Sequence, residues 1–440
     1  MSVVGLGKLG LCLAAVLASK GYRVKGVELD KPKVDAINRM KSPIYEPGLE
    51  QLIQEDAGRL VASTTYEGAV VGTDATFVVV PTPSDDSGAF SLKFVVPAME
   101  SIGRELGAKN RYHLVVLTST VMPGSMDGTV RPLLEKASGK VCGKDFGLCY
   151  NPEFIALGNV IGGLLRPDFI LIGESDPEAG SLLMAIQHCI CDNSPPIERM
   201  EFVNAELAKI AVNSFVTMKM SFANTLAEIS EKTPGGNVDK ITSAIGRDKR
   251  IGTAYLKGAL GYGGPCFPRD NVAFARYAKS VGAQARIAEA TNLVNIGQTK
   301  RIVSQMQEKG LRKGMKVGVL GLSYKPDTNV VDQSQSLVLA QLLNELGYEV
   351  SVFDPAAMEN AKTVLGDTVR YSRSAEDCVK ASDYVILATP WRDFLNITAR
   401  LFRRKVVFDC WRFFKDDTIR ASTYFCIGQG QNRWGEASNS

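Results

Sequence analysis

The chain has 440 residues, too many for one hydrophobic core, so two or three domains are expected. Hydrophobic residues at 45% and charged residues at 22% exclude a disordered chain, which lacks the apolar side chains to form a core. The 51 basic and 47 acidic residues give a net charge of +4 without a long basic run, which argues against nucleic acid as a partner and leaves an anionic small ligand.

The nine cysteines are odd in number and irregularly spaced, which argues against a secreted disulfide framework and predicts a reducing, cytoplasmic location. Cys189 and Cys191 have one neighbouring histidine, His188, and no second ligand pair follows at zinc-site spacing, so no metal is expected. No segment is long and apolar enough to span a bilayer, so no membrane partner is expected.

Residues 1–30 predict one strand-helix-strand unit, with a short buried strand at 2–4, a helix at 11–20 and a second strand at 23–28. No charged segment precedes the apolar residues, Lys8 interrupts them, and residues 5–10 have the pattern of a tight turn between a strand and a helix. The opening is therefore interpreted as part of a folded sheet and not as a signal peptide.

A Gly5-x-Gly7-x-x-Gly10 turn joins the first strand to the helix. Gly5 permits a sharp turn, Gly7 lets the backbone approach a pyrophosphate, and Gly10 lets the helix pack closely. Glu28 ends the second strand, where a carboxylate binds a ribose diol and repels a 2′-phosphate. The sequence therefore predicts NAD, in preference to NADP. The alternative is a glycine-rich turn in another kind of α/β sheet.

Apolar runs at 75–80 and 112–117 predict two further buried parallel strands. Pro81 and Thr82 follow the first run, and Thr120 lies in the hydroxyl-rich loop after the second. Loops at the carboxyl ends of strands face the ligand crevice in a doubly wound sheet, so these residues are candidate cofactor contacts. The alternative is that the hydroxyls only cap the following helices.

Residues 202–231 have apolar side chains at helical spacing and predict a long helix that ends before Pro234. Lys209 and Asn213 are four residues apart, so both side chains leave one helical face and can contact one oxygen of a substrate. A solvated polar stripe is the alternative, and periodicity alone does not decide between the two.

The octapeptide at 263–270 places a thiol, Cys266, between glycines and the pair Arg269 and Asp270. A thiol can add to an aldehyde and hold it as a thiohemiacetal, while a neighbouring cation favours the thiolate and an aspartate carries protons. The alternative is that Cys266 is a small buried hydrophobic residue.

The last third of the chain repeats the pattern of residues 1–30 and predicts a second doubly wound sheet. Its first turn lacks the full glycine motif and is followed by Lys325, a point charge suited to a phosphate, so its ligand is expected to be a nucleotide diphosphate. The tail at 428–440 is expected to be a flexible end. The expected elements are strands at 316–320, 349–353, 384–388 and 406–409 and a helix at 336–346.

The chain resembles the UDP-glucose/GDP-mannose (nucleotide-sugar) dehydrogenase family over essentially its whole length. The motifs that carry the resemblance are Gly5-x-Gly7-x-x-Gly10, Thr118-Ser119-Thr120-Val121, Asn151-Pro152-Glu153-Phe154, Lys209 with Asn213, Arg250-Ile251-Gly252, residues 261–270 and Gly321-Leu322-Ser323-Tyr324-Lys325-Pro326. The resemblance implies an α/β fold of two Rossmann-like doubly wound domains joined by a long central helix. It divides the chain into an NAD-binding domain (1–200), a helical dimerisation region (201–300) and a UDP-binding domain (301–440), and it implies a homodimer.

The resemblance also implies a four-electron oxidation, in which the C6 alcohol of a nucleotide sugar gives hydrides to two NAD molecules in turn and becomes a carboxylate. In this family pattern Lys209 and Asp270, through a water, take the hydroxyl proton and stabilise the alkoxide. Cys266 captures the aldehyde and carries it to a thioester. Glu153 helps water hydrolyse the thioester, and Thr120 and Asn213 position that water.

Two sets of binding residues are carried over from the family. The cofactor set is Gly5, Gly7, Lys8, Leu9, Gly10, Glu28, Pro81, Thr82, Thr120 and Arg269. The substrate set is Glu153, Phe154, Lys209, Asn213, Arg250, Tyr262, Gly263, Gly264, Cys266, Lys325 and Arg412. Lys325 is expected on the diphosphate and Arg250 on the sugar of a partner subunit. The glycines as a simple turn and Arg250 as a surface charge are the alternatives.

Three departures from the family pattern bear on the ligand. Ala156 and Leu157 replace an Arg and a Glu near cofactor and substrate, and Asp332 with Gln333 replaces an Arg-Glu pair. Where relatives have Asp-Gly-Arg, this chain has Asp-Cys-Trp before Arg412, so the resemblance leaves the ligand role of that arginine open.

UDP-glucose is the expected substrate, and UDP-N-acetylhexosamines, GDP-mannose or a dTDP-sugar are alternatives. A two-electron dehydrogenase of the 3-hydroxyacid type is an alternative that would need no thiol. A catalytically silent binder of NAD and a nucleotide sugar is a third hypothesis.

Overall fold

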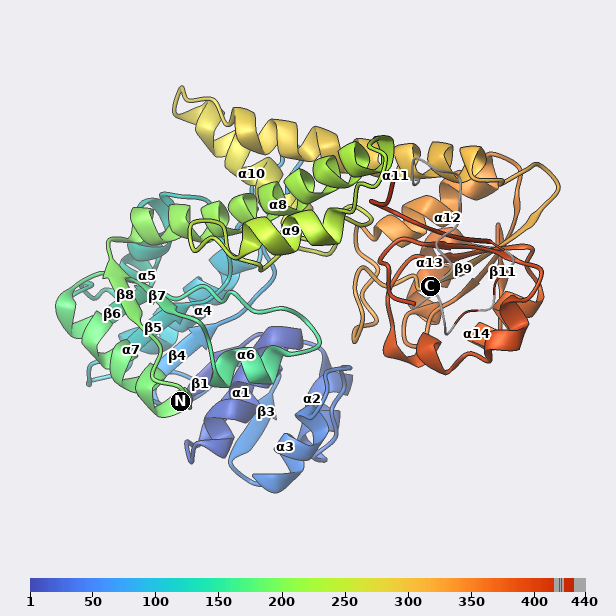
Figure 1. Cartoon of the computed structure of the whole chain (residues 1–440). Helices are drawn as coiled ribbons and strands as arrows, with labels where there is room; N and C mark the ends of the chain where they lie inside the picture. Colours follow the sequence, from blue (N-terminus) through green and yellow to red (C-terminus); the bar gives the residue numbers. More distant parts are fainter. Residues whose placement is uncertain (415–418, 420, 422, 431–440) are drawn as a thin grey trace. The chain divides into compact units, whose positions relative to one another are not determined.

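The computed structural model describes residues 1–414, 419, 421 and 423–430 and divides into two compact units, Met1–Val212 and Asn213–Ser440 (Figure 1). Each unit contains one twisted, mainly parallel sheet with helices on both faces. The predicted class, two Rossmann-like doubly wound domains with a long central helix, is confirmed.

The sheet of the first unit has the strand order β3-β2-β1-β4-β5-β6-β7-β8. β1 pairs in parallel with both β2 and β4, so the chain switches direction across the sheet there, where doubly wound folds bind their ligands. Only the β6–β7 pairing is antiparallel in this unit. The strands are β1 (Ser2–Val4), β2 (Val24–Val27), β3 (Leu60–Ser63), β4 (Ala75–Val78), β5 (Leu114–Leu117), β6 (Gly147–Tyr150), β7 (Ile170–Glu174) and β8 (Ile197–Met200).

Helices cover both faces of this sheet, because the central strands are apolar on both sides and need two layers of partners (Figure 1). One core joins α1, α3, α6 and α7 to the sheet, and the other joins α4, α5 and the start of α8. The helices are α1 (Lys8–Ser19), α2 (Lys31–Asn38), α3 (Leu49–Glu55), α4 (Val95–Gly107), the π-helix η1 (Met126–Val130), α5 (Arg131–Ser138), α6 (Val160–Leu165) and α7 (Pro177–Ile190).

The first helix begins earlier than the sequence predicted. We expected it at residue 11, but α1 starts at Lys8 with Gly7 as its N-cap. Gly10 therefore lies inside the helix and not at the end of the turn. It packs so closely on the turn that a side chain there would overlap the Gly5 carbonyl. The predicted strands at 75–80 and 112–117 are also shorter, at β4 and β5.

The predicted long helix is α8 (Phe202–Lys232), which runs from the first unit into the second. No helix within the described residues is long and apolar enough to cross a membrane. All nine cysteines lie in the described part of the chain, and none of them forms a disulfide.

The described sheet of the second unit has the order β11-β10-β9-β12-β13-β14, all parallel, which repeats the pattern of the first six strands. The predicted strands at 316–320, 349–353 and 406–409 are confirmed, and the strand predicted at 384–388 ends one residue earlier. The strands are β9 (Lys316–Leu320), β10 (Glu349–Phe353), β11 (Arg370–Tyr371), β12 (Tyr384–Leu387), β13 (Val406–Asp409) and β14 (Thr423–Cys426).

Helices α11, α12 and α13 pack with one core of this second sheet, and α14 with the short 3-10 helices η2 and η3 packs with the other. The predicted helix at 336–346 is α12, shifted by one residue. The helices are α9 (Val238–Gly246), α10 (Phe267–Ser280), α11 (Arg286–Glu308), α12 (Gln335–Glu345), α13 (Met358–Leu365), α14 (Ala375–Lys380), η2 (Arg392–Asn396) and η3 (Ala399–Phe402).

The start of the tail predicted to be flexible is folded. Gly428 donates its amide to Glu231 Oε1 at 2.7 Å, and its carbonyl accepts from Val238. Gly430 donates to the carbonyl of Gly236 at 3.0 Å, so the segment after β14 pairs with the connection between α8 and α9. Backbone pairing that depends on the tertiary fold gives no local sequence signal. Residues 431–440 of the predicted tail lie outside the described residues.

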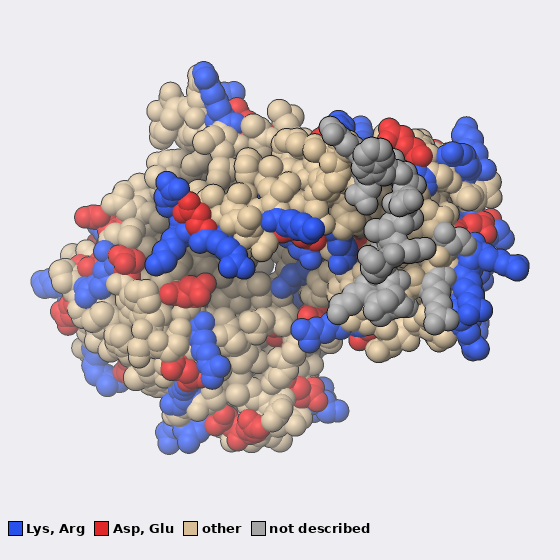
Figure 2. Space-filling model, in the orientation of Figure 1, with Lys and Arg blue, Asp and Glu red and all other residues tan. Residues whose placement is uncertain are grey.

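Lys and Arg side chains are interspersed with Asp and Glu over the visible face of the N-terminal unit (Figure 2). This mixture agrees with the small net charge of +4.

Candidate functional site

The glycine turn after β1 forms a tight cradle at the start of α1. Gly5 has φ +88°, and a Cβ there would overlap the carbonyl oxygen of Val79. A Cβ on Gly10 would overlap the carbonyl oxygen of Gly5, whereas a Cβ on Gly7 would meet nothing within 4 Å. The turn is therefore closed on the protein side and open at Gly7.

The start of α1 has the features that an anion requires. No side chain caps the helix at Gly7, so the first-turn amides of Lys8, Leu9 and Gly10 face outward at the positive end of the helix dipole. The open space at Gly7 is where a pyrophosphate approaches the backbone in this kind of turn. The residues present therefore fit a dinucleotide.

Glu28 lies just past the end of β2 and is oriented by two backbone amides. Oε2 accepts from Leu6 at 3.1 Å and Oε1 accepts from Asp30 at 3.1 Å, while the side chain is half-buried. Tyr66 lies nearby: burial, and secondarily the charge of Glu28, raise the pKa of its hydroxyl. The Glu28 carboxylate is thus held in place while the residue stays partly exposed, as ribose binding requires. Tyr66, which lies near this carboxylate, was missed by the sequence reasoning.

The loops after β4 and β5 are bonded to each other. The Thr82 hydroxyl donates to the Thr120 carbonyl at 2.7 Å, and the Ser119 hydroxyl donates to the Val80 carbonyl at 2.6 Å. Pro81 is exposed beside them. The structure brings Thr82 and Thr120 together, and the alternative that the hydroxyls of Thr82 and Ser119 cap helices is wrong, because both bond across the loops.

Sequence reasoning missed Glu206, which holds the loop that follows Thr120. Its carboxylate accepts from the amides of Gly124 at 2.6 Å and Met126 at 2.8 Å, and the residue is completely buried. Desolvation raises the pKa of Glu206 to about 7, against the lowering effect of these amides. The sequence did contain a signal for this residue, because Glu206 is a charged residue on the apolar side of the predicted helix, three positions before Lys209.

Glu153, Phe154 and Lys209 form one group in the first unit. Lys209 Nζ donates to the Glu153 carbonyl at 2.6 Å and lies 4.5 Å from the centroid of the Phe154 ring. Lys209 is 6% exposed. Glu153 as a residue is partly exposed, but desolvation raises the pKa of its carboxyl to about 7, although the charge of Lys209 opposes the shift.

Asn213 and Asp270 form the corresponding pair in the second unit. Asn213 Nδ2 donates to Asp270 Oδ2 at 2.6 Å, and Arg269 Nε and Nη2 lie 3.3 Å from Oδ1 of the same carboxylate. Asp270 is 1% exposed. Since Lys209 and Asn213 are both buried, the alternative of a solvated polar stripe is wrong for this pair.

Cys266 is exposed and occupies the N-cap of α10. Its carbonyl accepts from the Asp270 amide at 2.8 Å, so the thiol and the buried carboxylate belong to one helical turn. The start of a helix stabilises negative charge, which suits a thiolate or the oxyanion of a thiohemiacetal. The alternative that Cys266 is a small buried hydrophobic residue is wrong, because the side chain is exposed.

The loop before Cys266 is anchored at Tyr262, whose amide donates to Asn295 Oδ1 at 2.7 Å and whose carbonyl accepts from Asn295 Nδ2 at 3.0 Å. Gly264 has φ +88° and donates to the Asp332 carbonyl at 2.9 Å. A Cβ on Gly263 would overlap the carbonyl of Gln333. The predicted sugar loop therefore packs on the backbone of Asp332 and Gln333, the second departure from the family pattern.

Lys325 is brought to the same loops. A Cβ on Gly264 would lie 2.7 Å from the ring of Tyr324, the residue that precedes Lys325. Tyr262, Gly263, Gly264 and Lys325 thus lie on two adjoining loops of the second unit.

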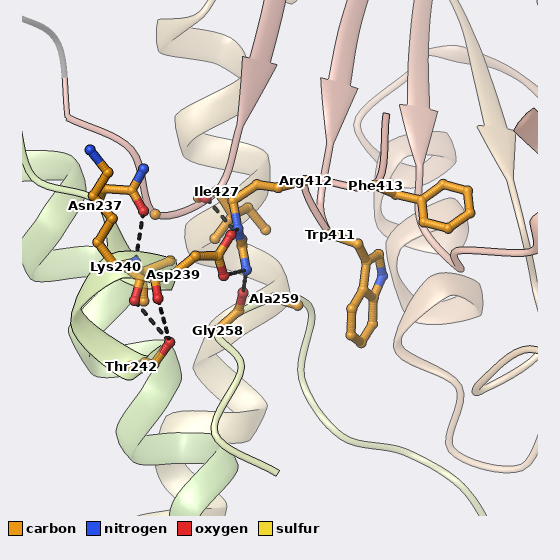
Figure 3. A network of polar contacts seen from close by, with 12 residues as sticks. Asn237, Asp239, Lys240, Thr242, Gly258, Ala259, Trp411, Arg412, Phe413 and Ile427 are labelled. Atoms are coloured by element: carbon orange, nitrogen blue, oxygen red, sulfur yellow. Dashed lines mark hydrogen bonds and ion pairs between the residues drawn. The ribbon is translucent and has the colours of Figure 1, made fainter. Parts of the chain in front are cut away.

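The two predicted substrate arginines have different surroundings. Arg250 is 88% exposed and bonds Asp248 at 2.6 Å, within its own loop. Arg412 is 6% exposed and forms an ion pair with Asp239, with Nε 2.6 Å from Oδ2 (Figure 3). Whether either arginine contacts substrate stays a prediction.

Three sequence profiles of one family match this chain. The profile "UDP-glucose/GDP-mannose dehydrogenase family, NAD binding domain" matches residues 1–190, the central domain of the family matches 203–296, and its UDP binding domain matches 318–416. The NAD binding domain and the fit of the glycine turn confirm the prediction of NAD as the cofactor.

Known proteins resemble the chain over nearly its whole length. A UDP-glucose 6-dehydrogenase from Haloferax volcanii is 35% identical over 93% of this chain and 96% of its own. A GDP-mannose 6-dehydrogenase from Pseudomonas aeruginosa is 31% identical over 97% of this chain and 99% of its own. The solved structure of a UDP-glucose dehydrogenase from Pyrobaculum islandicum has a TM-score of 0.89 at 37% identity and covers 97% of both chains.

Proposed function

Because the chain belongs to the UDP-glucose/GDP-mannose dehydrogenase family, we propose that it oxidises the C6 alcohol of UDP-glucose to the carboxylate of UDP-glucuronate. The observation that carries the proposal is the exposed Cys266 at the start of α10, one turn from the buried pair of Asp270 and Asn213. UDP-glucose is preferred because the relative at 35% identity acts on it.

In the first half-reaction the alcohol loses a proton and a hydride and becomes an aldehyde. Bound NAD supplies the hydride acceptor. Asp270 accepts the hydroxyl proton through a water, and the ammonium of Lys209 stabilises the alkoxide. Lys209 suits this role because it is buried and fixed by the Glu153 carbonyl, so its charge acts with little screening.

In the second half-reaction Cys266 Sγ forms a bond to the aldehyde carbon, and the aldehyde oxygen takes up a proton to give a thiohemiacetal. Loss of a second hydride, which a second NAD molecule would accept, and of that proton gives a thioester. Water then adds to the carbonyl, the C–S bond breaks, and the products are the carboxylate and the regenerated thiol. Glu153 accepts the proton of the water, and Thr120 and Asn213 position it.

Binding of the nucleotide sugar is assigned to the loops of the second unit. Lys325 neutralises the diphosphate, and the loop from Tyr262 to Gly264 surrounds the sugar. Phe154 and Arg250 contribute to the sugar side, and Arg269 contributes to the cofactor side. The exposure of Arg250 supports a reach to another subunit, since the side chain is 88% exposed and bonds Asp248 within its own loop.

An apolar stripe on α8 supports a homodimer. Phe215, Phe222 and Ile229 follow one another every seven residues, and they are 59%, 52% and 54% exposed. Leu293 and Ile296 of α11 are 72% and 65% exposed. Large apolar side chains repeated along helices favour burial against another protein surface, and we assign a second copy of this chain to it. A reducing cytoplasm remains the proposed compartment.

The test is to follow NADH while the purified protein and NAD react with UDP-glucose, GDP-mannose and UDP-N-acetylhexosamines. We expect two NADH per UDP-glucose consumed and loss of turnover in Cys266→Ser, with Cys189→Ser, another exposed thiol, as the matched control. One NADH per sugar, or an active Cys266→Ser, would contradict the covalent route and favour a two-electron dehydrogenase. Preference for GDP-mannose would identify a GDP-mannose dehydrogenase of the same family. Tight binding of NAD and a nucleotide sugar without turnover would identify a catalytically silent binder.

A further inference from the structure

Arg412 is engaged on several sides by groups of its own unit (Figure 3). Nε and Nη2 donate to both oxygens of Asp239, at 2.6 and 3.0 Å. Nη2 also donates to the Gly258 carbonyl at 2.7 Å, and Nη1 donates to the Ile427 carbonyl at 2.9 Å. The charge is thus neutralised by a bidentate carboxylate, and two carbonyls take further donors.

These partners join three separate segments of the chain. Asp239 is in the first turn of α9, Ile427 follows β14, and Gly258 begins the loop that leads to Cys266. Arg412 itself follows β13 and has φ +53°, a conformation that is uncommon for a residue with a side chain. One guanidinium therefore ties the end of the second sheet to the start of the loop.

The turn that carries Arg412 is fixed by the last residue of β13. Asp409 is completely buried, and its carboxylate accepts from the amides of Trp411 at 2.8 Å, Phe413 at 2.7 Å and Phe414 at 2.9 Å. The indole of Trp411 donates to the Ala388 carbonyl at 2.8 Å. The residues that replace the family's glycine thus anchor a turn that directs Arg412 toward Asp239.

The loop beyond Gly258 is held at successive residues. The Ala259 amide donates to Asn224 Oδ1 at 2.8 Å, and its carbonyl accepts from Gln298 Nε2 at 2.7 Å. Gly258 itself packs so tightly on α8 that a Cβ would lie 2.6 Å from the Ala223 carbonyl. Since the Tyr262 amide and carbonyl are also bonded, the bond from Arg412 is the first of a series that fixes the path to Cys266.

We propose that Arg412 is a positioning residue, which holds the loop at 258–266 through Gly258 and Asp239, and that it does not bind the nucleotide diphosphate. This inference rests on the proposed function for its catalytic consequence. To bind a phosphate, the buried guanidinium would have to break its bidentate pair with the half-exposed Asp239 and leave the Gly258 and Ile427 carbonyls without their donor. The diphosphate is left to Lys325 and backbone donors.

The test compares Asp239→Asn, Arg412→Met, Arg412→Lys and the Asp239→Asn/Arg412→Met double variant. Glu349→Gln is the matched control, because it makes the same acid-to-amide change in an exposed pair with Lys316 in the same unit. Amide hydrogen exchange at 258–266 is measured without any ligand. UDP affinity and kcat/KM for UDP-glucose are measured in parallel.

We expect exchange at 258–266 to rise in all three single variants, and Arg412→Lys not to restore protection because an ammonium lacks the bidentate fork. Loosening of the loop should lower kcat/KM about tenfold or more, while UDP affinity changes by less than about threefold. The double variant should be about as impaired as either single variant, since both remove one tie. If Arg412→Met does not fold, Asp239→Asn and Arg412→Lys carry the test.

Loss of UDP affinity in Arg412→Met with normal affinity in Asp239→Asn would overturn the proposal and make Arg412 a ligand contact. Unchanged exchange at 258–266 in Asp239→Asn would overturn it as well. Should the wild-type protein fail to oxidise any nucleotide sugar, the proposed function is wrong, yet the exchange measurement still decides whether Arg412 holds the loop.

Discussion

Glu153 and Glu206 have pKa values raised to about 7 by the same cause, desolvation, but their surroundings give them different roles. Both oxygens of Glu206 accept backbone amides, so this carboxylate is committed to holding the loop after Thr120. Glu153 as a residue is partly exposed, and Lys209 bonds its backbone carbonyl. A carboxyl with a pKa near neutrality suits a base, and the difference in backbone bonding supports Glu153 in thioester hydrolysis.

The pKa of Glu153 predicts how activity depends on pH. Only the carboxylate accepts a proton, so hydrolysis should increase as pH rises through about 7 and fall about tenfold per unit below it. Glu153→Gln should slow hydrolysis about 100-fold or more, release two NADH per site in a burst, and then stall as the thioester. Stopped-flow absorbance from pH 5.5 to 8.5 measures both effects.

Stability should respond in the opposite sense. The folded-state pKa of Glu153 lies above its unfolded value, so its contribution to stability is present below pH 4.5 and is lost as pH rises through about 7. Glu153→Gln removes this loss, so its Tm should gain on the wild type as pH rises from 4.5 to about 7, and the difference should level off at higher pH. A pH limb that survives in Glu153→Gln would assign the titration to another group, such as Glu206.

Helical spacing placed Lys209 and Asn213 on one face, because a helix fixes which side chains lie together, but only the family resemblance gave these residues, Cys266 and Asp270 their expected roles. The sequence left open whether Lys209 was buried, since burial depends on Phe154 and Glu153, more than fifty residues earlier. Glu206 was missed for the same reason. Its partners, Gly124 and Met126, are about eighty residues away.

At the level of elements, the two sheets begin with the same turn. Gly5 donates to the last carbonyl of β2 at 2.8 Å, and Gly321 donates to the last carbonyl of β10 at 2.8 Å. In each case the next amide donates to a carboxylate just past that strand, Glu28 or Asp354. The echo between the two ends of the chain, inferred from sequence, is a repeat of individual hydrogen bonds.

The second turn differs in what its carboxylate faces. Asp354 is 1% exposed, and its Oδ2 also accepts from the Ser323 amide and the Trp391 indole, at 2.9 and 3.1 Å. In the second turn the ring of Trp391 thus covers Asp354, whereas its counterpart in the first turn, Glu28, is partly exposed. The sequence indicated a different ligand through Lys325, but not this closure, because Trp391 comes from a distant loop after β12.

The glycines of the first turn predict two separable effects. In Gly10→Ala the new Cβ overlaps the Gly5 carbonyl, so unfolding should become easier by about 1–3 kcal/mol and Tm should fall. In Gly7→Ala the Cβ enters open space, so Tm should hold while NAD affinity drops about tenfold or more, because the methyl group occupies the approach of the pyrophosphate. Calorimetric unfolding and NAD titration measure the two quantities.

Gly128→Ala is the matched control, since a Cβ at Gly128 also meets nothing within 4 Å but lies away from the turn. Normal NAD affinity in Gly7→Ala would show that the dinucleotide does not approach the backbone there. Equal losses of Tm in Gly7→Ala and Gly10→Ala would contradict the conclusion that the turn has open space at Gly7.

For the whole molecule, the order of elements was readable because each sheet is built from local strand-helix-strand units. What joins those units was not readable. The ion pair between Asp239 and Arg412 spans more than 170 residues, and the pairing of the segment at 428–430 with the start of α9 spans nearly 200. Such ties leave no periodic pattern, which is why residues 428–430 were wrongly assigned to a flexible end and the bonds of Arg412 within its own unit were not foreseen.

The proposed dimer makes the last prediction, which concerns sites shared between two copies. If Arg250 acts on the sugar of the partner subunit, Arg250→Ala and Cys266→Ser should each be inactive alone, yet restore activity when mixed after reversible dissociation. Random pairing makes about half of the dimers mixed, and in each mixed dimer one site of two has both an intact thiol and an intact partner arginine. About a quarter of wild-type activity should therefore return.

The stripe on α8 supplies the control for this experiment. Phe222→Glu places a charge in the centre of the apolar surface, so it should give a monomer by sedimentation and abolish complementation when introduced into both variants. Arg250→Ala that retains activity alone, or a mixture that stays inactive while exchange of subunits is verified by mass, would place Arg250 outside the shared site. Because Arg250 is 88% exposed and bonds Asp248 within its own loop, its loss should leave the folded subunit intact, and any loss of activity then reports on the partner's substrate.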